Sequence, residues 1–128
     1  MPTILVVDDD PEIRSTLKKL LELSGHSIFT ASSGVEAQQC LAKEDVDLMI
    51  TDIVMPDQDG LENMKASKLL KPDLPIVAMS GGGRLKTENY LRLAKAFGAT
   101  AVLEKPFDTA TLLQTIQQAL QRPSESSD

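Results

Sequence analysis

The chain has 128 residues, of which 41% are hydrophobic and 25% are charged, so it is long enough for one domain with a core of its own. Its formal charge of −6 argues against direct binding to nucleic acid, because phosphate backbones are bound by basic surfaces. A single cysteine excludes an internal disulfide, and no apolar run or basic leader predicts a membrane helix or a signal peptide, so we expect a cytoplasmic protein.

The chain begins with a strand that is followed by a helix. A short apolar run predicts the strand over residues 3–7. The helix is predicted over residues 11–24, because Asp10 is a favoured N-cap residue and Pro11 suits the first helical position. Gly25 is typical of the residue that ends a helix.

Four further pairs of a strand and a helix follow. Ser33 and Glu36 have the spacing of a capping box, and Asp108 is the predicted N-cap of the last helix. The predicted elements are, in order, a strand over 27–31, a helix from Ser33 to about Lys43, a strand over 47–51, a helix that starts near Gly60, a strand over 75–79, a helix over 86–97, a strand over 101–104 and a helix over 109–121. This alternation predicts an α/β fold, an open parallel sheet with helices on both faces. The helix near Gly60 has the weakest apolar stripe of the five.

Polar side chains with complementary chemistry follow four of the predicted strands. Asp8 and Asp9 come after the first strand, Asp52 after the third, Ser80 after the fourth and Lys105 after the fifth. Ligands of parallel sheets bind at the carboxyl ends of the strands, so these side chains are expected to meet at one edge. Three carboxylates, a hydroxyl and an ammonium suit a divalent cation together with a phosphoryl group.

Four segments, by their order and spacing, resemble those of a known protein family. VVDDD at 6–10, TDIVMPDQDG at 51–60, MSGGG at 79–83 and EKPF at 104–107 resemble the receiver domain of two-component response regulators. The resemblance runs from residue 3 to about residue 121. It implies a flavodoxin-like, doubly wound sheet of five strands in the order 2-1-3-4-5. It also implies a cis peptide bond between Lys105 and Pro106.

The expected domain covers residues 1–121, and residues 122–128 are expected to form a frayed tail because they contain no core-forming residues. With no further segment after this domain, the chain resembles a stand-alone, single-domain response regulator.

The expected metal is Mg²⁺, because hard carboxylate oxygens are its usual ligands in proteins. The resemblance implies that Asp9 binds the ion directly and that Asp8 binds it through water, and Asp52 is the third expected carboxylate of the metal site. It also implies that Val54 contributes its backbone carbonyl.

The expected chemistry is the transfer of a phosphoryl group to Asp52, since a carboxylate can act as a nucleophile and form an aspartyl phosphate. The donor implied by the resemblance is the phosphohistidine of a sensor histidine kinase or of a histidine phosphotransfer protein. Lys105 would be a charge partner of the phosphoryl group, and Ser80 would detect it with its hydroxyl. Such a phosphoacceptor assists its own phosphorylation and dephosphorylation and is not an enzyme in the usual sense.

The expected output is a conformational shift toward a downstream protein, or transfer of the phosphate onward. The implied contact surface is formed by the helix at 86–97, the strand at 101–104 and the helix at 109–121. Many receivers have an aromatic residue three positions before the lysine, where this chain has Val102. An aliphatic side chain has no comparable rotor, so we expect Val102 to contribute packing alone.

Three other interpretations stay open at this point. A phosphohydrolase of the haloacid dehalogenase type also uses an aspartate nucleophile, but it expects a second aspartate where Val54 stands. A flavodoxin-like FMN binder would have its phosphate loop after the first strand, where this chain has three aspartates, and the chain has few aromatic residues for a flavin. The third is a receiver-like scaffold that is not phosphorylated.

Overall fold

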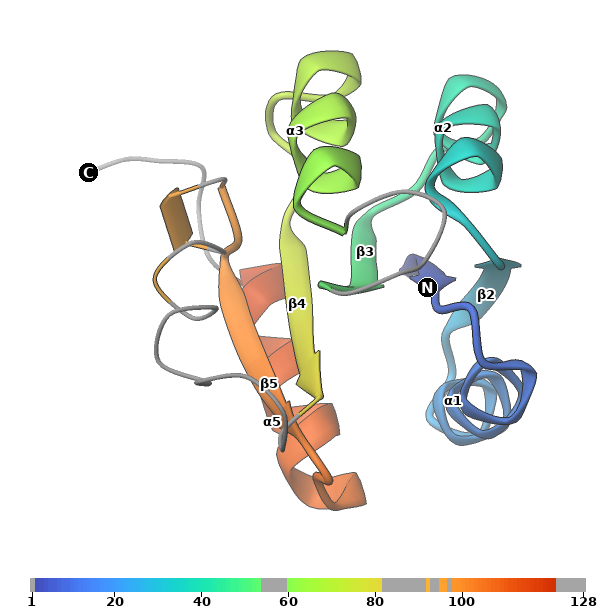
Figure 1. Cartoon of the computed structure of the whole chain (residues 1–128). Helices are drawn as coiled ribbons and strands as arrows, with labels where there is room; N and C mark the ends of the chain where they lie inside the picture. The colour runs from blue at the N-terminus through green and yellow to red at the C-terminus, as the bar shows by residue number, and fades with distance from the viewer. Residues whose placement is uncertain (1, 54–59, 82–91, 93–94, 97, 122–128) are drawn as a thin grey trace.

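The fold is a five-stranded parallel sheet flanked by helices (Figure 1). The computed structural model describes residues 2–53, 60–81, 92, 95–96 and 98–121. The strands are β1 (Thr3–Val7), β2 (Ser27–Ala31), β3 (Leu48–Asp52), β4 (Ile76–Gly81) and β5 (Ala101–Lys105). Within the described residues, the helices include α1 (Pro11–Leu23), α2 (Gly34–Lys43), α3 (Gly60–Leu70) and α5 (Thr109–Gln121). The sheet order is β2-β1-β3-β4-β5, which confirms the predicted order.

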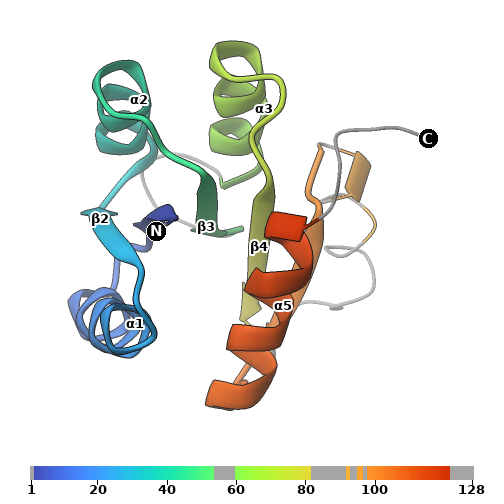
Figure 2. The same cartoon turned by 180° about the vertical axis from the view of Figure 1, so that it is seen from behind.

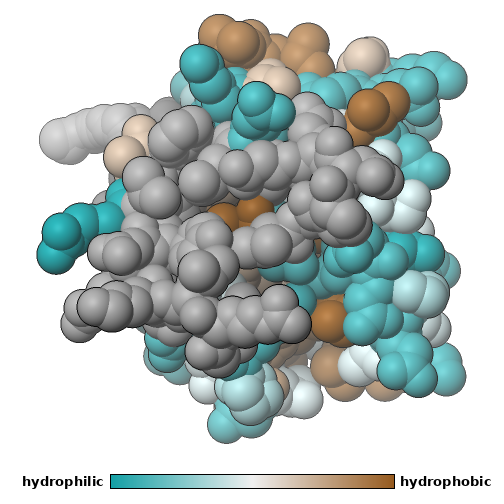
Figure 3. Space-filling view, in the orientation of Figure 1, coloured by the Kyte–Doolittle hydropathy of each residue, from teal (hydrophilic) through white to brown (hydrophobic). Residues whose placement is uncertain are grey.

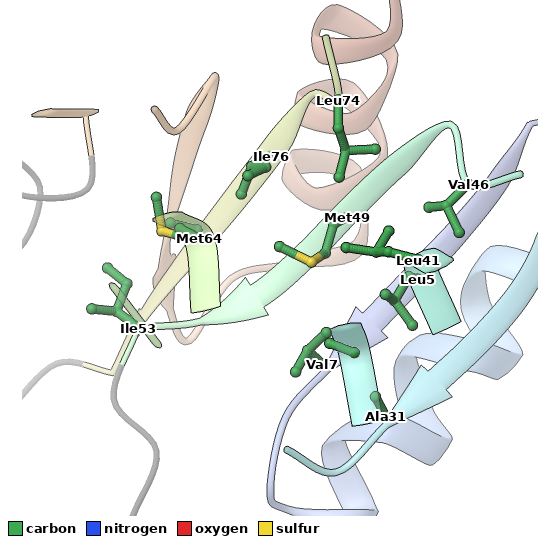
Figure 4. Packing of buried hydrophobic residues seen from close by; sticks show 12 residues of the cluster. Leu5, Val7, Ala31, Leu41, Val46, Met49, Ile53, Met64, Leu74 and Ile76 are labelled. Atoms are coloured by element: carbon green, nitrogen blue, oxygen red, sulfur yellow. The ribbon is translucent and has the colours of Figure 1, made fainter. Parts of the chain in front are cut away.

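Helices cover both faces of the sheet, as predicted. Figures 1 and 2 show α2 and α3 on one face and α1 and α5 on the other. Successive strand residues point to opposite faces, so Leu5 and Val7 join the α2–α3 side while Ile4 and Val6 join the α1–α5 side. Figure 4 shows the packing of the first of these two cores. Burial on both faces explains why the central strands are continuous apolar runs.

Three strands end one or two residues later than the sequence predicted. β3 runs through Asp52, β4 runs through Gly81 and β5 runs through Lys105. In the parallel register, Asp52 pairs with Met79 and Lys105 pairs with Gly81. Backbone pairing does not depend on side-chain polarity, so the strands continue after their apolar runs stop. Asp52, Ser80 and Lys105 therefore belong to the strands themselves.

The predicted helix caps are present, with one correction. The Asp10 carboxylate accepts a hydrogen bond from the Glu12 backbone N–H at 2.9 Å, and Asp108 accepts one from the Thr111 N–H at 2.7 Å. Ser33 caps α2, but the Glu36 carboxylate does not return to the Ser33 backbone as a capping box requires. It accepts instead from the backbone N–H and the hydroxyl of Ser32, at 2.7 and 2.9 Å.

Two further predictions concern the end of α1 at Gly25 and the peptide bond before Pro106. Gly25, which follows the C-cap of α1, has a φ of +96°, a backbone conformation that side chains disfavour. The peptide bond between Lys105 and Pro106 is cis, as predicted. The helix predicted over 86–97 lies largely outside the described residues, and so does the predicted tail at 122–128.

The outer surface combines hydrophilic regions with small hydrophobic ones (Figure 3). Two exposed leucines, Leu69 and Leu70, form the end of α3, where the space-filling view shows hydrophobic side chains. Among the described residues, no helix has both the length and the apolar character that a membrane crossing requires.

Candidate phosphoryl-acceptor site

Four of the five side chains that the sequence predicts at one edge of the sheet lie close together there, namely those of Asp8, Asp9, Asp52 and Lys105. Asp8 directly follows β1, and its backbone N–H donates to the Ala31 carbonyl at 3.1 Å. Asp52 is the last residue of β3, and Lys105 is the last residue of β5. Because β1, β3, β4 and β5 are consecutive neighbours in the sheet, their carboxyl ends form one continuous edge.

An ammonium group lies between two carboxylates at this edge. Lys105 Nζ is 3.1 Å from Asp8 Oδ2 and 3.6 Å from Asp52 Oδ2. The Asp8 side chain is only 1% exposed, whereas the Lys105 side chain is 21% exposed. A buried carboxylate needs a charged or hydrogen-bonding partner to offset the loss of its hydration. Lys105 supplies that partner to Asp8 and adds positive charge beside Asp52.

Two groups hold Asp8 in its buried position. Its Oδ1 atom accepts a hydrogen bond from the Asp10 backbone N–H at 2.9 Å. Its backbone carbonyl accepts one from Arg14 Nη1 at 2.8 Å. Sequence reasoning did not assign Arg14 to the site. Its place in the first turns of the helix that starts beside the acidic residues was the available signal.

Three carboxylates at this edge fit a metal ion. One ligand atom from each of Asp8, Asp9 and Asp52 lies within 4.8 Å of the others. Asp8 and Asp52 are buried and Asp9 is exposed, so the group opens to solvent on one side. Hard carboxylate oxygens with access to water suit Mg²⁺, which retains several waters when it binds to proteins. Val54, the expected carbonyl ligand, lies outside the described residues.

Ser80 occupies the strand beside Asp52. It lies in β4 one residue after Met79, the register partner of Asp52, and it is 3% exposed. Gly81 follows it in the strand and pairs with Lys105. Ser80 is therefore enclosed between the two strands that carry Asp52 and Lys105. The glycines at 82 and 83 lie outside the described residues.

A second group near the site was not predicted from the sequence. Thr51, Asn63 and Ser67 are fully buried polar residues on the α2–α3 side of the sheet. Their sequence signal was the weak apolar stripe of α3, which contains two of them.

Comparisons with known proteins agree with this geometry. The family profile of the response regulator receiver domain matches residues 4–117. The DNA-binding transcriptional regulator NtrC of Azospirillum brasilense is 39% identical over 118 residues, which are 92% of this chain and 24% of that protein. This chain thus spans about a quarter of the length of that relative.

Solved structures show the same fold. A receiver domain protein from Clostridium thermocellum has a TM-score of 0.87 and 31% identity, over 95% of this chain and 96% of that chain. The receiver domain of NtrC4, in a beryllofluoride-activated dimer, has a TM-score of 0.85 and 32% identity, over 94% of this chain and 98% of that chain. The chain belongs to the receiver domain family of two-component response regulators.

Proposed function

We propose that Asp52 is the phosphoacceptor of this receiver domain and that it takes its phosphoryl group from a phosphohistidine. The observation that supports the assignment is the position of Asp52 at the end of β3. Its carboxylate has Lys105 Nζ at 3.6 Å and belongs to the same close group of ligand atoms as Asp8 and Asp9. Membership of the receiver family favours this function over the phosphohydrolase and flavin-binding alternatives.

In the proposed reaction, a carboxylate oxygen of Asp52 attacks the phosphorus of the donor. The P–N bond to histidine breaks as the new P–O bond forms, and the histidine leaves with the electron pair and takes up a proton. Lys105 places its positive charge beside the carboxylate and the incoming anionic group. The Ser80 hydroxyl is assigned to detection of the phosphoryl group, to which it can donate a charge-assisted hydrogen bond.

Asp8, Asp9 and Asp52, with the backbone carbonyl of Val54, are the residues that would hold Mg²⁺. When bound, the ion supplies positive charge that offsets the charge of the phosphoryl group. The part of Asp8 is to complete the acidic group while keeping its ion pair with Lys105. Asp9, as the exposed member, is the carboxylate most accessible from solvent.

The proposed partners are a sensor histidine kinase or a histidine phosphotransfer protein as donor, and a downstream protein as target. The target surface would comprise residues 86–97, β5 and α5. Hydrolysis of the aspartyl phosphate, assisted by the same residues, would end the signal. A cytoplasmic location stays a prediction of this proposal.

The acceptor assignment is tested by chemical phosphorylation. Wild-type protein and Asp52→Asn are each incubated with acetyl phosphate and Mg²⁺, and their intact masses are measured. We expect one phosphoryl adduct on the wild type and none on the variant, because an amide lacks the nucleophilic oxygen anion. A full adduct on Asp52→Asn would place the acceptor elsewhere. Absence of any adduct on the wild type, with phosphohistidine donors as well, would support the scaffold interpretation.

The metal assignment is tested by titration with Mg²⁺. We expect Asp9→Ala to bind Mg²⁺ at least about tenfold more weakly than the wild type, because the variant loses a ligand carboxylate. Asp45→Ala, which removes an exposed carboxylate before β3, is the matched control and should bind as the wild type does. Equal affinity in Asp9→Ala and the wild type would remove Asp9 from the site.

A further inference from the structure

A chain of polar side chains links the α2–α3 surface to the site. Its members are Gln38 of α2, Asn63 of α3 and Thr51 of β3. Asn63 and Thr51 have no exposed surface, and Gln38 is half-buried. The hydrophobic cluster on this side of the sheet consists of aliphatic, methionine and alanine side chains (Figure 4), and Ser67 is a further buried polar residue there. Polar groups in such a core are costly unless each has a hydrogen-bond partner.

The hydrogen bonds of this chain run in one direction. Gln38 Nε2 donates to Asn63 Oδ1 at 2.7 Å. Asn63 Nδ2 then donates to Thr51 Oγ1 at 3.1 Å. The Thr51 hydroxyl has one proton, and it donates this proton to the backbone carbonyl of Asp52 at 3.2 Å. Asn63 and Thr51 therefore each accept a hydrogen bond from the previous residue and donate one to the next. The last acceptor is the backbone carbonyl of Asp52, the proposed phosphoacceptor.

The peptide group that joins Asp52 to Ile53 is held on both of its sides. Its carbonyl accepts from the Thr51 hydroxyl. Its N–H donates to the Met79 carbonyl of β4 at 2.9 Å. A peptide group with both polar atoms bound has a fixed orientation, because rotation would break one bond or the other. This peptide also sets the direction in which the chain leaves the acidic group.

Stability alone does not account for these residues. Replacing both partners of a buried hydrogen bond by apolar groups of similar shape can be neutral or stabilising. What apolar side chains would not supply is a directed contact to the Asp52 carbonyl. The structural consequence particular to this polar chain is thus the orientation of the backbone at Asp52.

We infer that Thr51, Asn63 and Gln38 are positioning residues, which orient the Asp52 backbone for Mg²⁺ binding and phosphorylation. The inference rests on the proposed role of Asp52 and adds residues from α2, α3 and β3 that touch neither metal nor phosphate. Ser67 belongs to the same polar cluster but lies on a side branch. It accepts from Gln38 Nε2 at 2.9 Å and donates to Met49 Sδ at 3.6 Å, away from Asp52.

The test uses Thr51→Val, which keeps the β-branched shape and removes the hydroxyl, and Thr51→Ser, which keeps the hydroxyl. Two quantities are measured on the whole chain, the carbonyl ¹³C chemical shift of Asp52 without metal and the dissociation constant for Mg²⁺. For Thr51→Val we expect a changed carbonyl shift and about fivefold weaker Mg²⁺ binding, the scale of one hydrogen bond. Thr51→Ser, which keeps the hydroxyl, should have the same carbonyl shift and Mg²⁺ dissociation constant as the wild type.

Ser67→Ala is the matched control for a general loss of stability. It removes a buried hydroxyl of the same cluster and should leave the Mg²⁺ dissociation constant within about twofold of the wild type. Asn63→Leu breaks the same series of hydrogen bonds and serves as the test if Thr51→Val does not fold. It should weaken Mg²⁺ binding as Thr51→Val does.

Wild-type Mg²⁺ affinity in Asn63→Leu, or in a folded Thr51→Val, would overturn the inference. So would weakening in Ser67→Ala that equals that of Asn63→Leu. A wild-type protein that binds Mg²⁺ but is not modified on Asp52 would refute the proposed function instead.

Discussion

At the scale of residues, the site depends on how three charges share one edge of the sheet. Asp8 and Asp52 are both buried, and Lys105 Nζ lies 3.1 Å from Asp8 Oδ2 and 3.6 Å from Asp52 Oδ2. Removing one member of a buried ion pair costs more than the net attraction between the two, because the other charge is left without a partner. Lys105 is therefore expected to contribute to folding as well as to phosphoryl chemistry.

Lys105→Met keeps much of the side-chain volume and removes the charge. We expect the free energy of unfolding without metal to fall by about 2 kcal/mol, since Asp8 loses a charged hydrogen-bond partner. Saturating Mg²⁺ should raise the melting temperature of the variant more than that of the wild type, because the ion meets carboxylates with no competing ammonium. Urea and thermal unfolding with and without Mg²⁺ measure both effects.

The matched control is Lys18→Met. Lys18 forms an exposed ion pair with Glu22 on α1 at 3.0 Å, with about half of each side chain exposed. Exposed pairs of this kind contribute about 0.5 kcal/mol or less, so this variant should remain close to the wild type. If the two lysine variants lose equal stability, the buried pair has no special part in folding.

At the scale of elements, the start of α2 shows how local hydrogen bonds depend on pH. The Ser32 backbone N–H and then the Ser32 hydroxyl lower the pKa of Glu36 below its ordinary value of 4.5, because both donate to the carboxylate. A carboxyl group whose folded pKa is lowered adds stability above its unfolded pKa. That contribution is lost as the pH falls through the folded value.

The lowered pKa of Glu36 sets the direction in which stability should depend on pH. Glu36→Gln should be less stable than the wild type near neutral pH, and the difference should shrink as the pH falls from about 5 to about 3. Urea unfolding at a series of pH values measures it. Ser32→Ala should weaken this pH dependence without removing it, because the backbone N–H still donates to Glu36. A difference between wild type and Glu36→Gln that grows toward low pH would contradict the assignment.

At the scale of the whole molecule, the proposed function requires a signal to pass from Asp52 across the sheet toward β5. Ser80 lies in β4 between the strands of Asp52 and Lys105. Val102 of β5 is partly buried and packs against the core on the α2–α3 side, as expected for a packing residue. The Ser80 hydroxyl and the Val102 side chain belong to different strands, so single substitutions can separate their contributions to signalling.

The corresponding prediction compares Ser80→Ala with Val102→Ala. Beryllofluoride and Mg²⁺ should shift the backbone amide signals of residues 81–97 in the wild type, because the Ser80 hydroxyl gains a charged acceptor. Ser80→Ala should reduce those shifts while Asp52 stays modifiable, and Val102→Ala should preserve them. A wild-type response in Ser80→Ala, or a response abolished by Val102→Ala alone, would show that the signal takes another route.

The alternation of strands and helices, the caps at Asp10, Ser33 and Asp108, and the gathering of charged residues at one edge could all be predicted from the sequence. These features depend on local patterns, because helix caps act within one turn and strands that run parallel place their carboxyl ends together. Strand order came from family resemblance, since periodicity reports which face of a strand is buried and not which strands are neighbours.

The carboxylate that is buried beside Lys105 could be identified only from the packed fold. Asp8 and Lys105 are 97 positions apart in sequence, and their 3.1 Å contact depends on the order and register of the strands between them. The hydrogen bond between Asn63 and Thr51 could not be predicted from the sequence either. A weak apolar stripe on α3 does not show which residues of other elements will face that helix. Local sequence preferences act over a few residues, whereas these contacts exist only once distant elements pack together.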